Sequence, residues 1–201
     1  VQAFNIQFAD GTTWDKAAIQ ANLEALATTG TEATDTLIGD SGDNNLNGLA
    51  GNDYLYGGGG NDVLNGNEGS DQLGGEAGDD VLYGGIGDDQ LSGGSGNDSL
   101  YGGDGYGDSL SGDEGNDLLN GGLGNNDYMY GRQGADIYQF GLGYGQDKAS
   151  DSNDSYNGMD VNTIQLLADI AVSDVRLTRI NQDLQLSVVG TTDSLTLQNY
   201  F

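Results

Sequence analysis

The sequence predicts an all-β protein, a parallel β-roll (a type of solenoid) with a short strand-helix cap at its amino end and a β cap at its carboxy end. Three observations predict this class. One nine-residue pattern repeats twelve times between residues 30 and 139. Each copy places an acid or its amide at the sixth position and an apolar side chain two positions later. The 201 residues include 37 glycines and no proline, which suits tight turns joined by unbroken backbone ladders.

The cleanest copy is residues 57–65, in which four glycines precede Asn61, Asp62, Val63, Leu64 and Asn65. The sixth-position residues are Asp35, Asn44, Asp53, Asp62, Asp71, Asp80, Asp89, Asp98, Asp108, Asp117, Asp127 and Asp136. The apolar residues two positions later are Leu37, Leu46, Leu55, Leu64, Leu73, Leu82, Leu91, Leu100, Leu110, Leu119, Met129 and Tyr138. A spacing kept over twelve copies indicates one structural unit repeated along the chain.

Each copy predicts one short strand and one turn. Three residues around the apolar side chain are expected to form the strand, because successive side chains alternate faces and only the central one turns inward. The six preceding residues are expected to reverse the chain, with glycines supplying positive φ. The fifth position is expected to adopt the left-handed region, which Asn and Asp tolerate best. It holds Asn52, Asn61, Asp79, Asp88, Asn97 and Asn116. Two copies would form one turn of a flattened coil, so alternate copies stack on the same edge.

This stacking predicts two rows of acidic side chains. Asp35, Asp53, Asp71, Asp89, Asp108 and Asp127 fall on one edge, and Asn44, Asp62, Asp80, Asp98, Asp117 and Asp136 on the other. Turns repeat every ~4.8 Å along a β ladder. Two unit charges ~5 Å apart repel by roughly 3 kcal/mol at an effective dielectric of ~20. Cations between successive carboxylates are therefore expected.

Calcium is the expected cation, as several ions. Oxygen ligands in a flexible loop suit Ca²⁺, which takes about six to eight of them, better than Mg²⁺ with its strict octahedron. The chain has no His and no Cys, the usual ligands of zinc, copper and haem. The candidate ligands are Asp35, Asp53, Asp62, Asp71, Asp80, Asp89, Asp98, Asp108, Asp117, Asp127, Asp136 and Asp147, with the glycine-loop carbonyls of Gly51, Gly60, Gly69, Gly78, Gly87 and Gly96. Because each copy has so little apolar surface to bury, residues 30–139 are expected to be disordered without calcium and to fold on binding it.

Composition excludes several partners. The chain has 32 acidic against 5 basic residues and a net charge of −27, which repels nucleic acids and acidic membranes. No apolar run approaches the ~20 residues of a membrane span. The lack of cysteine leaves the redox compartment undetermined. The chain starts at Val1, carries no secretory signal of the usual amino-terminal kind, and looks like a piece of something longer.

The flanks predict two caps, residues 1–29 and 140–201. The first would contain a strand over 1–11 and a helix over roughly 14–27. It would either cover the open end of the solenoid or present a partner-binding helix. The second would contain strands over 163–167, 175–180, 184–189 and 194–198, forming a β cap that protects the exposed sheet edge.

The repeat departs from its pattern near both ends. The first two copies have Thr31, Ala33 and Asp40 in place of glycine and Asn44 in place of an acid, so calcium affinity should be lowest there. The copies 102–111 and 121–130 each contain ten residues. Their enlarged loops are interpreted either as neutral drift or as a change in the ion site.

Two acidic features follow the repeats. Asp147 keeps the spacing of Gly143 and Gly145 and is expected to close the last ion site. The loop with Asp151, Asp154 and Asp160 is interpreted either as a further calcium site or as a solvated loop.

These repeats and flanks resemble the RTX family of bacterial secreted proteins, which carry haemolysin-type calcium-binding repeats. The tail, from Tyr138-Gln139-Phe140-Gly141 to Leu197-Gln198-Asn199-Tyr200-Phe201, is similar to the flank that follows the repeats in RTX cytolysins. It differs at Lys148-Ala149, where that flank usually has a Thr-Ile pair, so the packing of the last strand could change. The opening, residues 4–14, resembles the segment that comes shortly after such a tail in proteins with tandem blocks.

The resemblance implies a role in secretion. Such proteins leave the cell unfolded through the type I secretion apparatus, directed by a carboxy-terminal signal that this piece lacks, and fold outside where calcium is plentiful. A neighbouring tandem block is a further implied partner. The parent protein would be secreted.

Two other functions compete with a calcium-binding folding module. One is an enzyme that cleaves polysaccharides with paired carboxylates. It lacks support because the repeat itself explains the acids, and few basic residues are present to bind an acidic sugar. The other is an adhesin or glycan-recognition module using outward Tyr54, Tyr56, Tyr83 and Tyr101.

Overall fold

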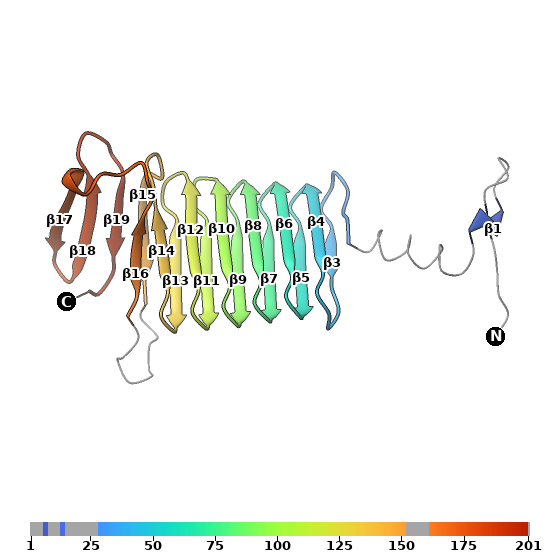
Figure 1. Ribbon diagram of the computed structural model, residues 1–201. Coiled ribbons are helices and arrows are strands. Elements are labelled where there is room, and N and C mark those ends of the chain that lie inside the picture. Colours follow the sequence, from blue (N-terminus) through green and yellow to red (C-terminus); the bar gives the residue numbers. More distant parts are fainter. Residues whose placement is uncertain (1–5, 8–12, 15–27, 152–160, 201) are drawn as a thin grey trace.

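The computed structural model describes residues 6–7, 13–14, 28–151 and 161–200. Residues 28–151 and 161–200 form two β-sheets and one short 3₁₀ helix, Val172–Asp174, and the described ranges contain no α-helix. Figure 1 shows the chain winding as a flattened coil whose strands alternate between the two sheets. The predicted parallel β-roll is confirmed. No helix in the described part of the chain is long and apolar enough to span a membrane.

Most strands of the coil belong to two parallel ladders. The seven-stranded sheet contains β4 (Asn45–Ala50), β6 (Val63–Glu68), β8 (Val81–Ile86), β10 (Ser99–Asp104), β12 (Leu118–Leu123), β14 (Ile137–Phe140) and β16 (Thr163–Leu166). The ten-stranded sheet contains β3 (Thr36–Ile38), β5 (Tyr54–Gly59), β7 (Gln72–Ala77), β9 (Gln90–Ser95), β11 (Ser109–Glu114), β13 (Tyr128–Gln133), β15 (Gln146–Ser150), β19 (Ser194–Leu197), β18 (Asp183–Val188) and β17 (Val175–Ile180).

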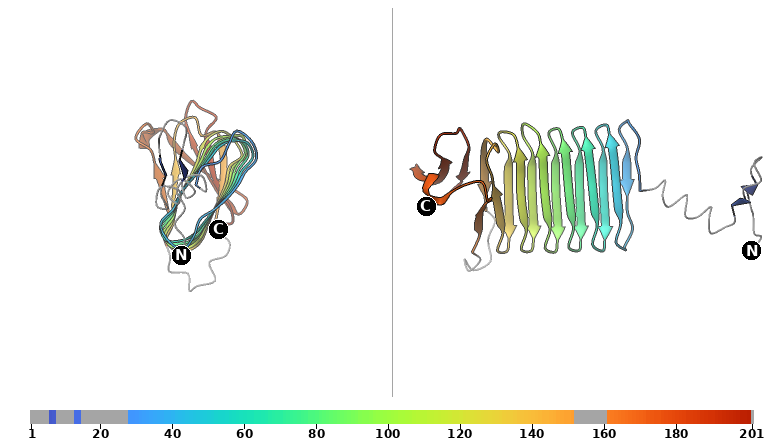
Figure 2. Two further views of the ribbon diagram at one scale, coloured as in Figure 1. Left: turned by 90° about the vertical axis from the view of Figure 1, so that its right-hand side faces the viewer. Right: turned by 45° about the horizontal axis from the view of Figure 1, so that its top comes forward.

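The register confirms that alternate copies stack. Leu64 of β6 pairs with Leu82 of β8, two copies later, and Leu55 of β5 pairs with Leu73 of β7. The view along the coil in Figure 2 shows successive turns superimposed. All twelve predicted apolar residues are buried between the sheets, from Leu37 to Tyr138. The core is therefore one column of side chains per sheet.

The strands are longer than predicted. The six-residue strand β6 begins at Val63 and runs through Leu64 into the first three positions of the next copy, ending at Glu68. Its burial alternates so that Leu64 and Gly66 both face inward. The prediction of three-residue strands was wrong because an inward glycine continues the strand as well as an apolar side chain does. Only about three residues remain to reverse the chain.

The left-handed residues also differ from the prediction. Positive φ occurs at the second and fourth positions, as at Gly58 (102°) and Gly60 (99°), and not at Asn61 of the fifth. Non-glycine residues occupy some second positions, including Glu76, whose φ is 74°. The fifth-position side chains instead accept hydrogen bonds from the next coil. The backbone N–H of Asp79, for example, donates to Asn61 Oδ1 at 3.0 Å.

The carboxy-terminal strands match the predicted ranges closely and extend both sheets. β16 pairs with β14, whereas β19 pairs in parallel with β15 and is followed by antiparallel β18 and β17. Ala149 is buried, and Lys148 points outward to donate to the Tyr128 hydroxyl at 2.8 Å. The departure from the usual flank is therefore accommodated within β15.

The amino-terminal residues described form one small antiparallel pair. β1 (Ile6–Gln7) pairs with β2 (Thr13–Trp14). The strand expected over 1–11 is described only at these two residues. Trp14, expected to begin the helix, lies in β2, and residues 15–27 lie outside the described ranges.

Candidate metal centre

The sixth-position acids lie inside the coil. The side chains of Asp53, Asp62, Asp71, Asp80, Asp89, Asp98, Asp108, Asp117, Asp127, Asp136 and Asp147 are only 0–2 % exposed. All but Asp147 directly precede a strand, as Asp62 precedes β6, whereas Asp147 lies within β15. In each case the buried side chain lies beside the apolar residues of the core. Burying so many carboxylates is costly unless each is paired or coordinated.

One oxygen of each carboxylate joins the coils. The backbone N–H of Asp62 donates to Asp80 Oδ1 at 2.7 Å, and the N–H of Asp80 donates to Asp98 Oδ1 at 2.8 Å. On the other edge the N–H of Asp53 donates to Asp71 Oδ1 at 2.7 Å. The predicted rows therefore exist, and each is a continuous ladder of charge-assisted hydrogen bonds.

The second oxygen is buried without a hydrogen-bond partner. This holds for Oδ2 of Asp53, Asp62, Asp71, Asp80, Asp89, Asp98, Asp108, Asp117, Asp127 and Asp147. An unsatisfied buried polar group costs about 1–3 kcal/mol, and a charged one costs more. Rows of carboxylate oxygens of this kind would coordinate metal ions.

In the regular copies, the first-position glycine keeps space beside the unpartnered oxygen. A Cβ built on Gly75 would meet Asp80 Oδ2 and, at 2.7 Å, the carbonyl oxygen of Gly93 in the next coil. The β ladder also skips this position, because Gly74 pairs with Ser92 and Glu76 pairs with Gly94. Asp80 Oδ2 and the Gly93 carbonyl oxygen therefore both border the space beside Gly75. Both are hard donors that fit Ca²⁺.

Backbone carbonyls must supply most ligands of any ion held here. Among the described residues, no three acidic side chains converge on one point. The predicted ligand glycines at the fourth position occupy the turns: Gly51, Gly60, Gly69, Gly78, Gly87 and Gly96, with φ between 99° and 139°. Their carbonyl oxygens stack along the edges, so that a Cβ on Gly69 would collide with the carbonyl oxygen of Gly51. Each turn can thus offer carbonyl oxygens together with one carboxylate.

Burial makes these carboxyl groups weak acids in the metal-free coil. Burial away from water is the largest cause that raises the pKa of these groups, and repulsion from neighbouring carboxylates raises it further. The pKa is raised in this way for Asp53, Asp62, Asp71, Asp80 and Asp127. The pKa of Asp98 rises to about 6, and those of Asp89, Asp108 and Asp117 to about 7. The pKa of Asp147 rises to about 8, through burial and then the charge of Asp127. At neutral pH the rows therefore need protons or cations to remain buried.

The first two copies differ from the rest. Asp35 is half-buried, and its Oδ2 accepts hydrogen bonds from the Thr31 backbone N–H at 2.6 Å and the Thr31 hydroxyl at 2.8 Å. Asn44 Oδ1 accepts the Asp40 backbone N–H at 2.7 Å. The local loop thus satisfies the oxygen that is unpartnered in later copies. This contact supports the expectation of weak calcium binding at the amino end.

The ten-residue copies keep the row intact. The backbone N–H of Asp89 donates to Asp108 Oδ1 at 2.8 Å, and that of Asp108 donates to Asp127 Oδ1 at 2.9 Å. Asn126 takes up the extra length with a left-handed φ of 68°. Neither insertion displaces the acid that follows it, which favours the interpretation as loop drift.

The carboxy ends of the two rows differ. Asp147 continues the first row, because the Asp127 N–H donates to its Oδ1 at 3.1 Å. In the second row the Asp136 N–H donates to Asn162 Oδ1 at 2.7 Å, so an amide ends the ladder. Sequence reasoning missed Asn162, since a long loop separates it from the repeats. It also missed Asp193, which accepts the N–H groups of Gly143 and Gly145 through its two oxygens.

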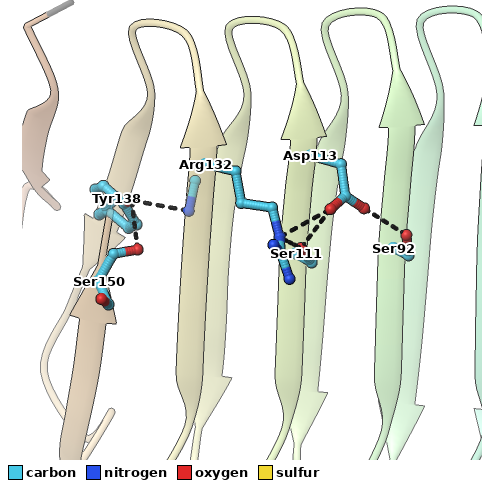
Figure 3. A network of polar contacts seen from close by, with 7 residues as sticks. Ser92, Ser111, Asp113, Arg132, Tyr138 and Ser150 are labelled. Carbon is cyan, nitrogen blue, oxygen red and sulfur yellow. Dashed lines mark hydrogen bonds and ion pairs between the residues drawn. The ribbon is translucent and has the colours of Figure 1, made fainter. Parts of the chain in front are cut away.

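Tyr138 replaces leucine in the last full copy and narrows its site. Its hydroxyl accepts the Gly131 backbone N–H at 2.9 Å and donates to the Ser150 carbonyl at 3.5 Å (Figure 3). A Cβ on Gly131 would meet both this hydroxyl and Asp136 Oδ2. A protein oxygen therefore occupies part of the space that is open beside the other acids.

A polar network covers the outer face of the ten-stranded sheet. Asp113 accepts from the Ser92 hydroxyl at 2.6 Å and forms an ion pair with Arg132 Nε at 2.8 Å (Figure 3). Arg132 Nε also donates to the Ser111 hydroxyl at 2.6 Å. These side chains are partly exposed and lie outside the rows, so they brace neighbouring coils and form no part of the metal centre.

The comparison with protein-family patterns agrees with this geometry. The family described as RTX calcium-binding nonapeptide repeat (4 copies) matches residues 29–64, 38–73, 65–100, 74–107, 103–126 and 126–146. No curated protein sequence matches the chain. A solved structure, the extracellular lipase LipA from Serratia marcescens, is 18 % identical with a TM-score of 0.43. The match covers 85 % of this chain and 37 % of the lipase chain. With family matches covering residues 29–146 and the repeat geometry in place, the chain belongs to the RTX calcium-binding nonapeptide repeat family.

Proposed function

We propose that this chain is the calcium-binding module of a bacterial secreted protein, disordered without calcium and folded once it binds the ion outside the cell. One observation carries the proposal: ten buried carboxylate oxygens lack a partner and lie in two rows. The ligands would be the predicted carboxylates, with carbonyl oxygens of the glycine turns. Bound calcium would supply the positive charge that each row lacks.

The chain's own residues would make folding depend on the ion. Oδ1 of each acid already accepts a hydrogen bond from a backbone N–H of the preceding coil, as Asp80 Oδ1 accepts one from the N–H of Asp62. An ion at Oδ2 would neutralise the same side chain, so ion binding and coil stacking would stabilise each other. An affinity of roughly 0.1–1 mM, typical of extracellular calcium modules, would leave the chain open inside the cell and folded outside.

The proposal includes two partners of the parent protein: the type I secretion apparatus that would export it, and a neighbouring tandem block of repeats. A chain that stays unfolded in the cytoplasm can pass through a narrow channel, and folding outside would oppose its return. The parent's own activity would reside elsewhere, with this module acting as a structural, non-enzymatic part. The localisation proposed for the parent is extracellular.

No specific observation favours glycan recognition. The four outward tyrosines predicted to form one surface lie on two different sheets: Tyr54 and Tyr56 on β5, Tyr83 on β8 and Tyr101 on β10. Tyr83 and Tyr101 stack on each other with ring centroids 5.1 Å apart. Stacked cross-strand aromatics stabilise a sheet without any ligand.

A calcium titration followed by far-ultraviolet circular dichroism tests the proposal. The β signal should appear cooperatively with calcium and disappear in chelator, and magnesium at equal concentration should not replace calcium. Asp80→Asn should raise the calcium midpoint, whereas the exposed neighbour Asp79→Asn removes the same charge and should leave it nearly unchanged. Equal effects of the two variants would contradict the assignment of the buried row as the metal centre.

A further inference from the structure

Each regular acid of the first row, which runs from Asp35 to Asp147, lies beside an open space in the core. A Cβ built on Gly66, the first-position glycine of β6, would meet Asp71 Oδ2 and, at 2.6 Å, the carbonyl oxygen of Gly84 in the next coil. Gly66 faces inward in the alternating burial pattern of β6. The space beside Asp71 therefore exists because the inward residue that precedes it has no side chain.

Phe140 takes the place of this glycine at the carboxy end of the coil. β14 pairs with β12, and Gln139 lies opposite Asn120 in their register. The next residues along the two strands are Phe140 and Gly121, so Phe140 stands where the preceding coil has its first-position glycine. Phe140 ends β14 in an inward position and is 0 % exposed, so its whole side chain lies inside the coil.

The side chain of Phe140 fills interior space that is open in the earlier coils. Its ring lies edge-on to that of Tyr144, with ring centroids 6.2 Å apart and an interplanar angle of 82°. The connection to the next acid is also longer than usual. Asp147 follows Phe140 by seven residues, whereas an acid of a regular copy follows its first-position glycine by five. The longer turn gives the benzyl group room, and the glycine space beside the acid is absent.

The turn before Asp147 is held by protein groups. Asp193 accepts the backbone N–H groups of Gly143 and Gly145, at 3.0 and 3.1 Å. Gly145 occupies the fourth position, two residues before the acid, where the carbonyl oxygens of earlier copies are predicted calcium ligands. Its carbonyl oxygen accepts the Ser194 backbone N–H at 2.7 Å. A donor from the carboxy-terminal strands therefore already engages the carbonyl oxygen that an ion would need.

Asp147 keeps only the hydrogen-bonding part of the role of the earlier acids. Its Oδ1 accepts the Asp127 backbone N–H at 3.1 Å, which continues the ladder by one step. Its Oδ2 is buried without a hydrogen-bond partner. Burial raises the pKa of Asp147 to about 8, and a protonated carboxyl group is neutral, so this side chain can remain buried without a cation.

We propose, as an extension that rests on the proposed function, that Phe140 closes the first row, so that Asp147 binds no calcium ion and the ions of this row end beside Asp127. Asp147 is then a positioning residue, whose Oδ1 holds the last coil in register through the Asp127 N–H. The sequence alone predicts that Asp147 closes the last ion site, because the pattern does not show that Phe140 lies at the place of the glycine. Shape decides where binding stops, since Asp147 has the same carboxyl group as the acids before it.

Two Asp→Asn variants in the same row test this assignment. Asp71→Asn should bind fewer calcium ions at the lowest calcium concentration that saturates the wild-type chain, and its calcium midpoint should rise at least tenfold, equivalent to about 1.4 kcal/mol. Asp147→Asn should keep the wild-type number of ions, and its midpoint should change by less than about twofold. An amide at residue 147 still offers Oδ1 to the Asp127 N–H. Native mass spectrometry counts the ions, and circular dichroism gives the midpoint.

Variants of Phe140 test the cause. Phe140→Gly restores the glycine of the earlier coils and should bind one ion more than the wild-type chain. The control Phe140→Leu keeps an apolar side chain at the same place and should bind no additional ion. Adding Asp147→Asn to Phe140→Gly should remove the additional ion, because the new site needs that carboxylate. If Phe140→Gly does not fold, the two Asp→Asn variants still decide the question.

Two outcomes would overturn the closure of the row by Phe140 and leave the proposed function standing. One is the loss of a bound ion in Asp147→Asn. The other is a folded Phe140→Gly chain that binds no additional ion. A wild-type chain that binds no calcium would overturn both proposals together. Circular dichroism of each calcium-loaded sample separates the loss of an ion from the loss of the fold.

Discussion

Acid should partly replace calcium in holding the coil together. The pKa values of Asp89, Asp108 and Asp117 are raised to about 7 and that of Asp147 to about 8, from an ordinary value of 3.8. Because these folded-state values are raised, the protonated carboxyls favour the folded metal-free chain below about pH 4. That stability is lost progressively as the pH rises from about 4, and it is gone above about pH 7 to 8, where the buried groups are ionised in the folded chain as well.

The magnitude is large enough to observe. Raising a pKa from 3.8 to about 7 corresponds to about 4 kcal/mol per group. Halving this for solvent screening still leaves about 2 kcal/mol per group, or roughly 8 kcal/mol for the four carboxyls. A typical domain has a net stability of about 5–15 kcal/mol. Ionisation of the rows without calcium should therefore remove most or all of the stability of the coil.

Circular dichroism of the metal-free chain between pH 4.5 and 8.5 measures this effect. The β signal should be strongest at the acid end and disappear between about pH 6 and 8. Asp89→Asn should extend the β signal to higher pH, because an amide keeps the hydrogen bond from Asp71 and cannot ionise. The control Asp88→Asn removes an exposed charge next in sequence and should have little effect. A metal-free β signal that stays constant or grows with pH would refute this reasoning.

Three further predictions concern single side chains. Gly75→Ala should raise the calcium midpoint at least tenfold, because its Cβ fills the space beside Asp80 Oδ2, whereas Gly74→Ala, with an ordinary 3.4 Å contact, should not. Glu76→Gly should stabilise the calcium-loaded chain against urea by about 1 kcal/mol, since glycine relieves the left-handed φ of 74°. Arg132→Ala should cost less than about 1 kcal/mol in the same urea assay, because its ion pair is partly exposed; a larger loss would show that the network does more than brace the outer face.

The sequence was sufficient to predict the coil, its register and the two acidic rows. A strict period fixes which side chains face inward, so burial of Leu64 and Asp62 follows once two copies form one turn. The strand length was wrong, because the pattern does not show that a first-position glycine such as Gly66 lies inside a strand. The role of the fifth position was also wrong. Propensity favours a left-handed Asn61, but a side-chain hydrogen bond to the next coil decides its conformation.

The ends of the rows could not be predicted. Asn162 completes the ladder of Asp136 from 26 residues further along the chain, and no local pattern identifies it. Asp193 likewise reaches Gly143 and Gly145 across some fifty residues of sequence. Contacts of this kind depend on where the carboxy-terminal strands pack. That placement is a tertiary property, whereas the repeat is a local one.

Small-angle X-ray scattering at pH 8, with calcium and then with chelator, tests the central claim most directly. The claim is that cations beside the unpartnered aspartate oxygens, more than the two apolar columns of the core, hold the coils together. In calcium the chain should scatter as a compact rod. In chelator its radius of gyration should rise toward about 48 Å, the value for an unfolded chain of 201 residues. A compact, unchanged particle in chelator at this pH would contradict the claim.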